Sequence, residues 1–245
     1  MKIIFIRHGD PDYEHDSLTE KGIREAKLLA ERVCQWENVT QFYCSPLGRA
    51  QRTASYSLEK TGREAITHDW MREFSYFIDD PVTGRHGVPW DFMPHYWTNI
   101  PEMYDREAWK ETMIYRSNDA LLPAYREVCE GLDSLLASYG YTREGNYYVT
   151  APDKKADSGQ KEDTIVIFCH LGVTCMMLSH LLGISPVLLL HGFFLATTSV
   201  TVLSSEERMD HAAYFRVQVM GDTRHLQQGG EPVSKAGFFT EPFQG

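Results

Sequence analysis

The chain has 245 residues, of which 42% are hydrophobic and 24% charged, and its formal net charge is −10. This composition is typical of a soluble globular protein, and the length suits one α/β domain with an insertion better than two small domains. The negative charge argues against a nucleic-acid-binding protein, which would normally present a basic face. It does not exclude an anionic substrate, because a few buried Arg and His residues can form a positive pocket within an acidic protein.

The cysteines and the apolar runs indicate the compartment. The five cysteines form no CxxC pair, their number is odd, and nothing before the first predicted strand reads as a signal peptide. We therefore expect reduced thiols and a cytoplasmic location. The longest apolar stretch, Val187 to Thr198, is too short to span a bilayer and contains His191, so we expect no membrane partner.

The N-terminal part alternates apolar runs with helical patterns. Lys2 to Ile6 is a short apolar run that predicts a buried strand, and it ends abruptly in Arg7-His8-Gly9. After a polar loop, Ser17-Leu18-Thr19-Glu20 has the S-x-x-E form of a capping box and predicts the start of a helix. Gln41 to Cys44 predicts a second strand, and Ser45-Pro46 leads into the next helix.

The segment from Phe74 to Tyr115 breaks this alternation. It holds 10 of the 30 aromatic residues of the chain and is punctuated by prolines. A flexible linker would be poor in aromatic residues, so we expect a folded insertion at about residues 74–118, which would form a cap over the site. The apolar stripe from Leu121 to Leu135 then predicts a helix.

The C-terminal part returns to the α/β pattern. The polar stretch 151–163 predicts a loop. Thr164 to Cys169 predicts a third core strand, which ends at His170-Leu171-Gly172. The remaining expected elements are a helix through Leu182, strands at 199–203 and 213–219, and an irregular tail at about 221–245.

Strands that alternate with helices predict the fold. We expect one domain over residues 1–245, a three-layer α/β/α sandwich with a mostly parallel central sheet and the inserted aromatic-rich cap. In such sheets ligands bind beyond the carboxyl ends of the strands. His8, Arg49 and His170 each follow one of the three predicted core strands. We therefore expect their side chains to converge at one edge of the sheet.

The residues at this edge suit the transfer of a phosphoryl group. A neutral imidazole such as that of His8 is a competent nucleophile near pH 7. Arg7 and Arg49 offer bidentate donors to phosphate oxygens. His170 can donate a further hydrogen bond, and Gly9 lets the backbone approach a phosphate closely. We therefore expect a small phosphorylated substrate.

The general acid that protonates the leaving alkoxide is less well defined. Glu73 is our candidate, and Asp10 and Asp12 are alternatives that the sequence leaves open. Gly84-Arg85-His86-Gly87 repeats the tripeptide but does not follow a strand, so we interpret it as a coincidence. The spacing of His86 and His95 matches no zinc-binding pattern.

Four motifs together resemble the histidine phosphatase (phosphoglycerate-mutase-like) superfamily, in its order and spacing. The resemblance covers roughly residues 1–75 and 160–205. The motifs are Arg7-His8-Gly9 after a strand, Cys44-Ser45-Pro46-Leu47-Gly48-Arg49-Ala50 with Thr53-Ala54, Arg72-Glu73, and His170-Leu171-Gly172-Val173.

The resemblance implies a catalytic site and its chemistry. His8 would become phosphorylated, Glu73 would donate the proton, and the phosphoryl group would be held by Arg7, Arg49 and His170. It also implies that no metal and no other cofactor is needed.

Asp10-Pro11-Asp12-Tyr13 departs from the residues that follow the tripeptide in mutase-type members. Asp-Pro is closer to the Glu-Pro of phosphatase members such as the α-ribazole phosphatase group. We therefore expect a phosphomonoesterase of the histidine acid phosphatase type. A phosphoglycerate-type mutase and a catalytically silent phospho-ligand-binding module are the alternatives, and a homodimer is compatible with the sequence.

Overall fold

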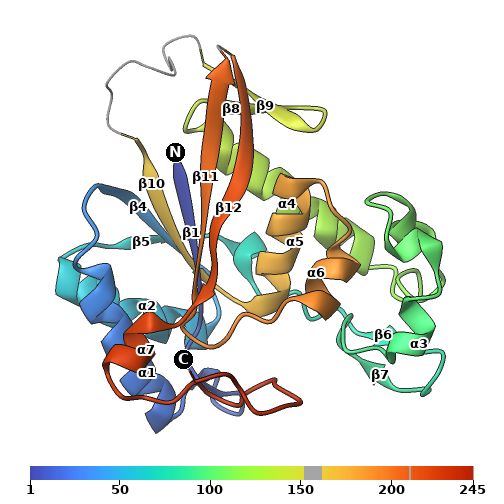
Figure 1. Ribbon diagram of the computed structural model, residues 1–245, viewed down its shortest axis with the longest axis horizontal. Helices are drawn as coiled ribbons and strands as arrows, with labels where there is room; N and C mark the ends of the chain where they lie inside the picture. The colour runs from blue at the N-terminus through green and yellow to red at the C-terminus, as the bar shows by residue number, and fades with distance from the viewer. Residues whose placement is uncertain (152–161, 210, 245) are drawn as a thin grey trace.

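A mixed sheet of eight strands crosses the molecule in the order β5-β4-β10-β1-β11-β12-β9-β8 (Figure 1). The structure is a computed structural model that describes residues 1–151, 162–209 and 211–244. Strands β1, β4, β5 and β10 run parallel, whereas β11, β12, β9 and β8 pair antiparallel. The strands are β1 (Lys2–Arg7), β4 (Val39–Cys44), β5 (Ala65–Thr67), β8 (Tyr141–Glu144), β9 (Tyr147–Thr150), β10 (Thr164–Cys169), β11 (Val200–Met209) and β12 (Ala212–Asp222).

Helices cover both faces of this sheet, so the predicted α/β/α class is confirmed (Figure 1). The prediction of a mostly parallel sheet was wrong, because β11, β12, β9 and β8 extend the parallel strands by antiparallel pairing. Alternate residues of β1 enter different cores, because successive side chains of a strand point to opposite faces. Ile4 and Ile6 pack with α1 and α2, whereas Ile3 and Phe5 belong to the core that contains α4, α5 and α6. The helices are α1 (Glu20–Val33), α2 (Gly48–Thr61), α4 (Leu121–Ala137), α5 (Leu171–Leu182), α6 (Pro186–Gly192) and α7 (Arg224–Gln228).

The aromatic-rich segment forms a folded cap with short elements, beside α4 and α6 (Figure 1). Its aromatic residues pack on one another: the ring centroids of Trp109 and Tyr115 are 5.2 Å apart, and those of Phe92 and Tyr115 are 6.0 Å apart. All three side chains are buried, so these rings form the core of the cap. Its elements are β6 (Ile78–Asp79), β7 (His86–Gly87), α3 (Pro94–Trp97) and the 3-10 turns η2 (Pro101–Met103) and η3 (Ala108–Glu111).

The tail expected to be irregular from about residue 221 instead contains the end of β12 and the helix α7, so this prediction was wrong in part. The predicted capping box was wrong in position, because Ser17–Leu18 forms a short strand, β3, that pairs with β2 (Pro11–Asp12). Thr19 is the N-cap of α1 instead, and its hydroxyl accepts a hydrogen bond from the Gly22 amide at 3.1 Å. Most of the polar stretch predicted as a loop, residues 152–161, lies outside the described residues. Among the helices that are described, none is long and apolar enough to cross a bilayer.

The parallel strands bring three chain segments to one edge of the sheet. In the register of the sheet Arg7 lies opposite Cys169, and Phe168 lies opposite Cys44. The strands β1, β10 and β4 therefore end side by side, at the edge where His8, His170 and Ser45 follow them. This edge is the position at which ligands bind in open α/β sheets.

Candidate active site

Four basic side chains converge beyond the carboxyl ends of β1, β4 and β10. Arg7 is the last residue of β1, and His8 follows it. Arg49 lies in the first turn of α2, and His170 is the N-cap of α5. Their exposed fractions are 6%, 1%, 9% and 0%, respectively. The ring centroids of His8 and His170 lie 5.1 Å apart. Such burial of basic groups is unusual unless they have a partner.

The backbone of Gly9 determines the tautomer of His8. His8 Nδ1 lies 2.8 Å from the Gly9 carbonyl oxygen, and since a carbonyl only accepts, Nδ1 carries the hydrogen. The pKa of His8 is well below its ordinary value because the ring is buried and because Arg7 and Arg49 repel a positive charge, although the bond to Gly9 opposes this shift. His8 is therefore neutral near pH 7, with the lone pair on Nε2.

The two arginines are each anchored at one nitrogen and unsatisfied at another. Arg7 Nη1 donates to the Leu195 carbonyl at 2.6 Å, and Arg49 Nη1 donates to Asp16 Oδ1 at 2.6 Å. The Nε atoms of both arginines are buried without a hydrogen-bond partner in the described part of the chain. Unsatisfied buried donors are rare and costly. Two such donors beside one nucleophile favour the binding of an anionic group.

His170 offers another unsatisfied nitrogen. Its Nε2 lies 2.7 Å from Ser45 Oγ, whereas its buried Nδ1 has no partner among the described residues. The pKa of His170 is also well below its ordinary value, first because of burial and then because of the nearby charges of His8, Arg49 and Arg7. When Nδ1 carries the hydrogen, it can donate to the anionic group.

The carboxyl group of Glu73 lies beside the first turn of α5, close to the cluster of four basic side chains. Its Oε1 accepts hydrogen bonds from the amides of Phe74 at 2.8 Å and Val173 at 3.1 Å. Burial raises the pKa of Glu73, although the Phe74 amide and the Arg7 charge act in the opposite direction. Since Oε1 accepts both amides, a proton on this carboxyl group belongs on Oε2. A raised pKa suits a general acid.

The carboxyl groups of the two alternative acids, Asp10 and Asp12, already have hydrogen-bond partners. Asp10 accepts a hydrogen bond from the Thr19 hydroxyl at 2.7 Å through Oδ2, and its Oδ1 accepts one from Ser234. Asp12 binds His15 Nδ1 at 2.8 Å, and this hydrogen bond lowers the pKa of Asp12. A carboxyl group with a lowered pKa is a poor proton donor, so the geometry favours Glu73.

The structure requires glycine at residue 9 for a steric reason. A Cβ at this position would lie 2.8 Å from the Gly22 carbonyl oxygen, so a side chain here would push the loop away from α1. The Gly9 amide donates to Thr53 Oγ1 at 2.9 Å, and that hydroxyl donates to the Arg49 carbonyl at 2.7 Å. Gly9 therefore ties the end of β1 to α2, and its amide already has a partner other than a phosphate.

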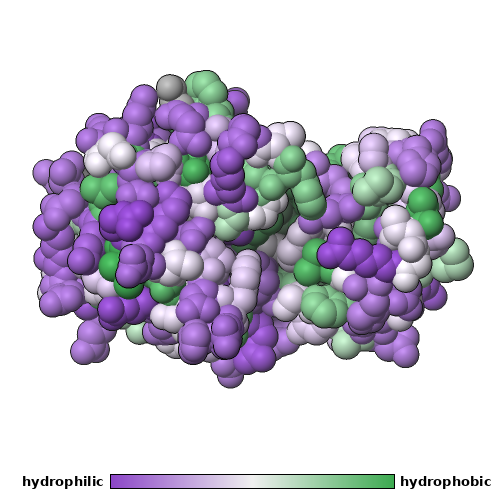
Figure 2. Space-filling model, turned by 90° about the horizontal axis from the view of Figure 1, so that it is seen from below, coloured by the Kyte–Doolittle hydropathy of each residue, from purple (hydrophilic) through white to green (hydrophobic). Residues whose placement is uncertain are grey.

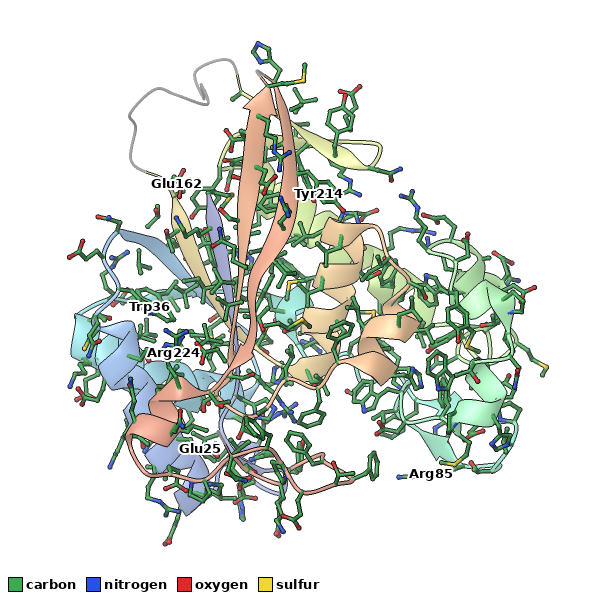
Figure 3. All side chains as sticks on the ribbon, in the orientation of Figure 1. Glu25, Trp36, Arg85, Glu162, Tyr214 and Arg224 are labelled. Carbon is green, nitrogen blue, oxygen red and sulfur yellow. The ribbon has the colours of Figure 1, made fainter. Side chains whose placement is uncertain are left out.

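The repeated tripeptide lies in the cap rather than after a core strand. His86 is on β7, is exposed, and has Nδ1 2.8 Å from Asp79 Oδ1. Figure 3 shows Arg85 at the lower edge of the cap. Arg52, one turn after Arg49, is exposed and lies over the ring of Tyr56 at 4.9 Å.

Aromatic side chains that sequence reasoning did not single out border the cluster. The Arg7 guanidinium lies over the Phe194 ring at 5.3 Å, and that of Arg49 lies over the Tyr13 ring at 5.5 Å. Figure 2 shows the molecule from this side, with a hollow between the sheet domain and the cap. These residues come from irregular loops, where no periodic pattern marks them, and the same holds for Asp16.

Gly172 makes room for the carboxyl group of Glu73, and this gives a first prediction. A Cβ at residue 172 would lie 2.7 Å from Glu73 Oε1 and 2.9 Å from the Trp90 ring. We expect Gly172→Ala to displace Glu73 and to lower kcat/KM by about 10²-fold, as small displacements of catalytic groups can. Assays on alkyl phosphates, with the melting temperature, measure this effect.

Gly192→Ala is the matched control for Gly172→Ala. A Cβ at Gly192, also in a helix, would meet nothing within 4 Å. Its kcat/KM should equal that of the wild type. An unchanged kcat/KM in a folded Gly172→Ala variant would argue against the position assigned to Glu73.

Phosphoryl transfer requires a nucleophile, donors for the phosphate oxygens and a proton donor. This site offers a buried neutral imidazole, two arginines with unsatisfied donors and a carboxyl group with a raised pKa. Residues 3–81 match the family model of the Histidine phosphatase superfamily (branch 1). The resemblance inferred from the motifs is thereby confirmed, and these residues are similar to this superfamily.

The similarity to individual proteins is low. A probable phosphoglycerate mutase GpmB from Yersinia pestis (strain Pestoides F) is 27% identical over 139 residues, which cover 53% of this chain and 57% of that protein. The match thus spans little more than half the length of this curated relative.

The similarity to solved structures covers most of the chain and shows the fold. A structure named mycobacterial hydrolase 1 has a TM-score of 0.59 at 20% identity and covers 90% of this chain and 98% of its own. The α-ribazole phosphatase from Shigella flexneri has a TM-score of 0.56 at 16% identity, covering 91% and 97%. A phosphoserine phosphatase mutant from Entamoeba histolytica has a TM-score of 0.56 at 20% identity, covering 92% and 98%.

Proposed function

We propose that this protein is a phosphomonoesterase that hydrolyses a small phosphorylated metabolite through a phosphohistidine on His8. The observation that carries the proposal is the bond from His8 Nδ1 to the Gly9 carbonyl, which leaves Nε2 as an unprotonated nucleophile beside Arg7 and Arg49. The similar structures named as phosphatases are consistent with hydrolysis.

The proposed reaction has two steps. In the first, His8 Nε2 attacks the phosphorus, the bond from phosphorus to the ester oxygen breaks, and Glu73 gives its proton to the leaving alkoxide. The equatorial oxygens receive hydrogen bonds from Arg7, Arg49 and His170. In the second step, Glu73 accepts a proton from water, the water oxygen attacks the phosphorus, and the bond from phosphorus to Nε2 breaks. Inorganic phosphate leaves, and the starting protonation states are restored.

The two titrating groups predict the pH dependence of kcat/KM. His8 must be neutral, so the rate is lost as the pH falls through its pKa, which lies well below 6.5. Glu73 must be protonated, so the rate is lost as the pH rises through its pKa, which is raised above 4.5. We expect a bell-shaped profile, with an acid limb below the ordinary pKa of histidine and an alkaline limb above the ordinary pKa of glutamate.

The variant Glu73→Gln assigns the alkaline limb of this profile. The amide does not titrate, so the residual activity should lose that limb while the acid limb is kept. An alkaline limb that persists unchanged in this variant would contradict the role of Glu73.

A phosphoglycerate-type mutase is the second candidate, and the observation in its favour is the similarity to the GpmB proteins. A mutase must keep water out while the phosphoryl group returns to a second hydroxyl. Incubation with 3-phosphoglycerate and a trace of 2,3-bisphosphoglycerate distinguishes the two. Release of phosphate without formation of the isomer supports hydrolysis, whereas isomer formation without phosphate release would establish the mutase.

A screen of phosphate monoesters, with release of inorganic phosphate as the readout, tests the proposed function directly. At least one alkyl phosphate should be hydrolysed, and turnover should persist in EDTA because the proposed chemistry uses the cluster of His and Arg. A chain that binds phosphate esters but hydrolyses none of them would instead be a phospho-ligand-binding module, and the proposal would be wrong.

A further inference from the structure

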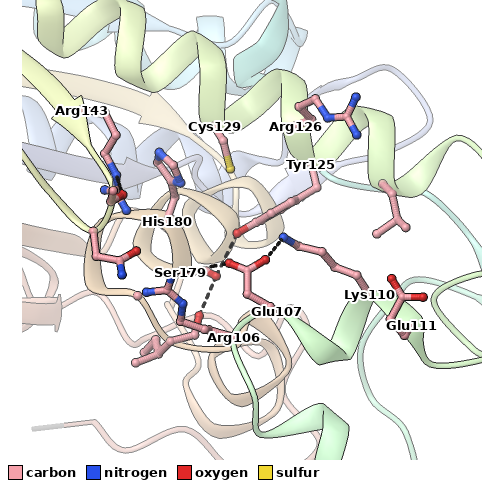
Figure 4. A pocket seen from close by; sticks show the side chains of 15 residues that line it. Arg106, Glu107, Lys110, Glu111, Tyr125, Arg126, Cys129, Arg143, Ser179 and His180 are labelled. Carbon is pink, nitrogen blue, oxygen red and sulfur yellow. Dashed lines mark hydrogen bonds and ion pairs between the residues drawn. The ribbon is translucent and has the colours of Figure 1, made fainter.

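A second pocket lies at the end of α5 that is far from His170. Its volume is about 470 Å³. Ser179 and His180 contribute from the last turn of α5, and Gly183 follows directly after it. The other walls are formed by η3 of the cap, α4 and the turn between β8 and β9 (Figure 4). The pocket therefore joins the cap to the sheet domain, and α5 runs between it and the candidate active site.

Positive charge exceeds negative charge in the lining of this pocket. It contains four Arg and Lys side chains and two carboxylates. Glu107 is shared between Lys110, at 2.6 Å, and Arg106, at 3.6 Å. Glu111 pairs instead with Arg116, which lies outside the lining. In a chain with a net charge of −10, such a local excess of cations indicates an anionic ligand. The four cationic residues are Arg106, Lys110, Arg126 and Arg143.

Arg143 is held in place by neighbouring groups, and one of its donors is unsatisfied. Its guanidinium lies over the Tyr148 ring at 5.0 Å, and its Nε donates to the Gly145 carbonyl at 2.8 Å. Its Nη1 is buried and has no hydrogen-bond partner within the described ranges of the chain. A guanidinium that is held against the Tyr148 ring and bonded through Nε, with Nη1 unsatisfied, is preorganised for an oxyanion.

His180 is oriented on the same side of the pocket. Figure 4 shows His180 beside Arg143, with Arg106 facing them, whereas Lys110 points to Glu107. His180 Nε2 donates to Asp133 Oδ2 at 2.9 Å, and Asp133 Oδ1 accepts the Tyr148 hydroxyl at 2.8 Å. One carboxylate thus fixes both the imidazole and the ring on which Arg143 stacks.

We propose that this pocket binds a small anion that carries phosphate or carboxylate groups, with Arg106 and Arg143 as the main ligands and His180 beside them. The excess of two positive charges in the lining favours a ligand with at least two negative charges. This site is separate from the His8 cluster, and the proposal stands whether or not the chain is a phosphatase.

Calorimetric titration with pyrophosphate and with citrate tests the site, and the two probes separate phosphate from carboxylate recognition. The proteins are the wild type, Arg143→Met, Arg106→Gln and Arg49→Gln, which impairs the catalytic cluster as an anion site. Arg216→Gln is the control for the loss of one charge, because Arg216 is exposed, pairs with Glu206 on β11 and lies outside the lining.

We expect at least one probe to bind the wild type, Arg49→Gln and Arg216→Gln with similar affinity at this site. Loss of a charge-assisted hydrogen bond should weaken binding by about tenfold or more in Arg143→Met and in Arg106→Gln. Since Arg106 is not stacked, its variant keeps the test valid if Arg143→Met is unstable. Binding that is lost in Arg49→Gln and retained in the two pocket variants, or no binding of either probe, would overturn the proposal.

Discussion

Replacement of His8 by alanine is expected to reduce the turnover of every phosphate monoester by about 10⁴-fold or more, since loss of a nucleophile has effects of this size. The substitution removes the only atom to which the phosphoryl group would be transferred. It leaves the guanidinium groups of Arg7 and Arg49 in place, so phosphate esters should still bind. Steady-state kinetics with p-nitrophenyl phosphate and a titration with inorganic phosphate measure the two effects separately.

His86→Ala is the matched control for this prediction. His86 belongs to the second Arg-His-Gly sequence but is exposed in the cap and paired with Asp79. Its turnover should equal that of the wild type. Turnover by a folded His8→Ala variant at a rate close to that of the wild type would show that another group attacks the phosphorus.

Glu73→Gln is expected to lower kcat/KM for alkyl phosphates by about 10² to 10⁴-fold, the usual contribution of a general acid. Glutamine has nearly the same shape, and its carbonyl oxygen can accept the amides of Phe74 and Val173 as Oε1 does. It cannot give a proton to an alkoxide. The loss should therefore be chemical, with little change in the melting temperature.

The leaving group tests this role of Glu73 more sharply than the size of the loss does. Because p-nitrophenolate leaves without being protonated, kcat/KM for p-nitrophenyl phosphate should fall far less than that for an alkyl phosphate. Asp12→Asn, at the alternative acid paired with His15, should change neither value. Equal losses for both substrates in Glu73→Gln would show that Glu73 supports the structure rather than the transfer of a proton.

The convergence of His8, Arg49 and His170 could be predicted because each follows an apolar run that reads as a core strand. Parallel strands end at a common edge, so residues far apart in the sequence are placed together. The tautomer of His8 could not be predicted, because it depends on a backbone turn that directs the Gly9 carbonyl to Nδ1. The same applies to Ser45 and its contact with His170.

The antiparallel half of the sheet was harder to predict than the parallel half. The strands β8 and β9 are joined by Gly145-Asn146, and Gly145 has a positive φ of 56°. A two-residue Gly-Asn loop between short runs is a hairpin signal that sequence reasoning could have used. Helix α6 also had a signal, since the Ser185 hydroxyl accepts from the Val187 amide and Pro186 stands at the first position.

The composition of the cap predicted that this segment is folded but did not predict how its rings pack. Its aromatic residues indicated a folded segment, and rings such as Trp109 and Tyr115 do form its core. Their packing partners come from short irregular elements with no periodic pattern. For this reason the contact of Trp90 with Gly172, beside Glu73, became visible only in the structure.

The most direct test of the central claim is to identify the residue that carries phosphate during turnover. The enzyme is mixed with p-nitrophenyl phosphate, quenched in alkali within the first turnover, digested and analysed by mass spectrometry. We predict one phosphoryl group on the peptide that contains His8, labile in acid and absent from His8→Ala. A phosphoryl group on another residue, or hydrolysis with no phosphorylated enzyme at any time, would contradict the mechanism.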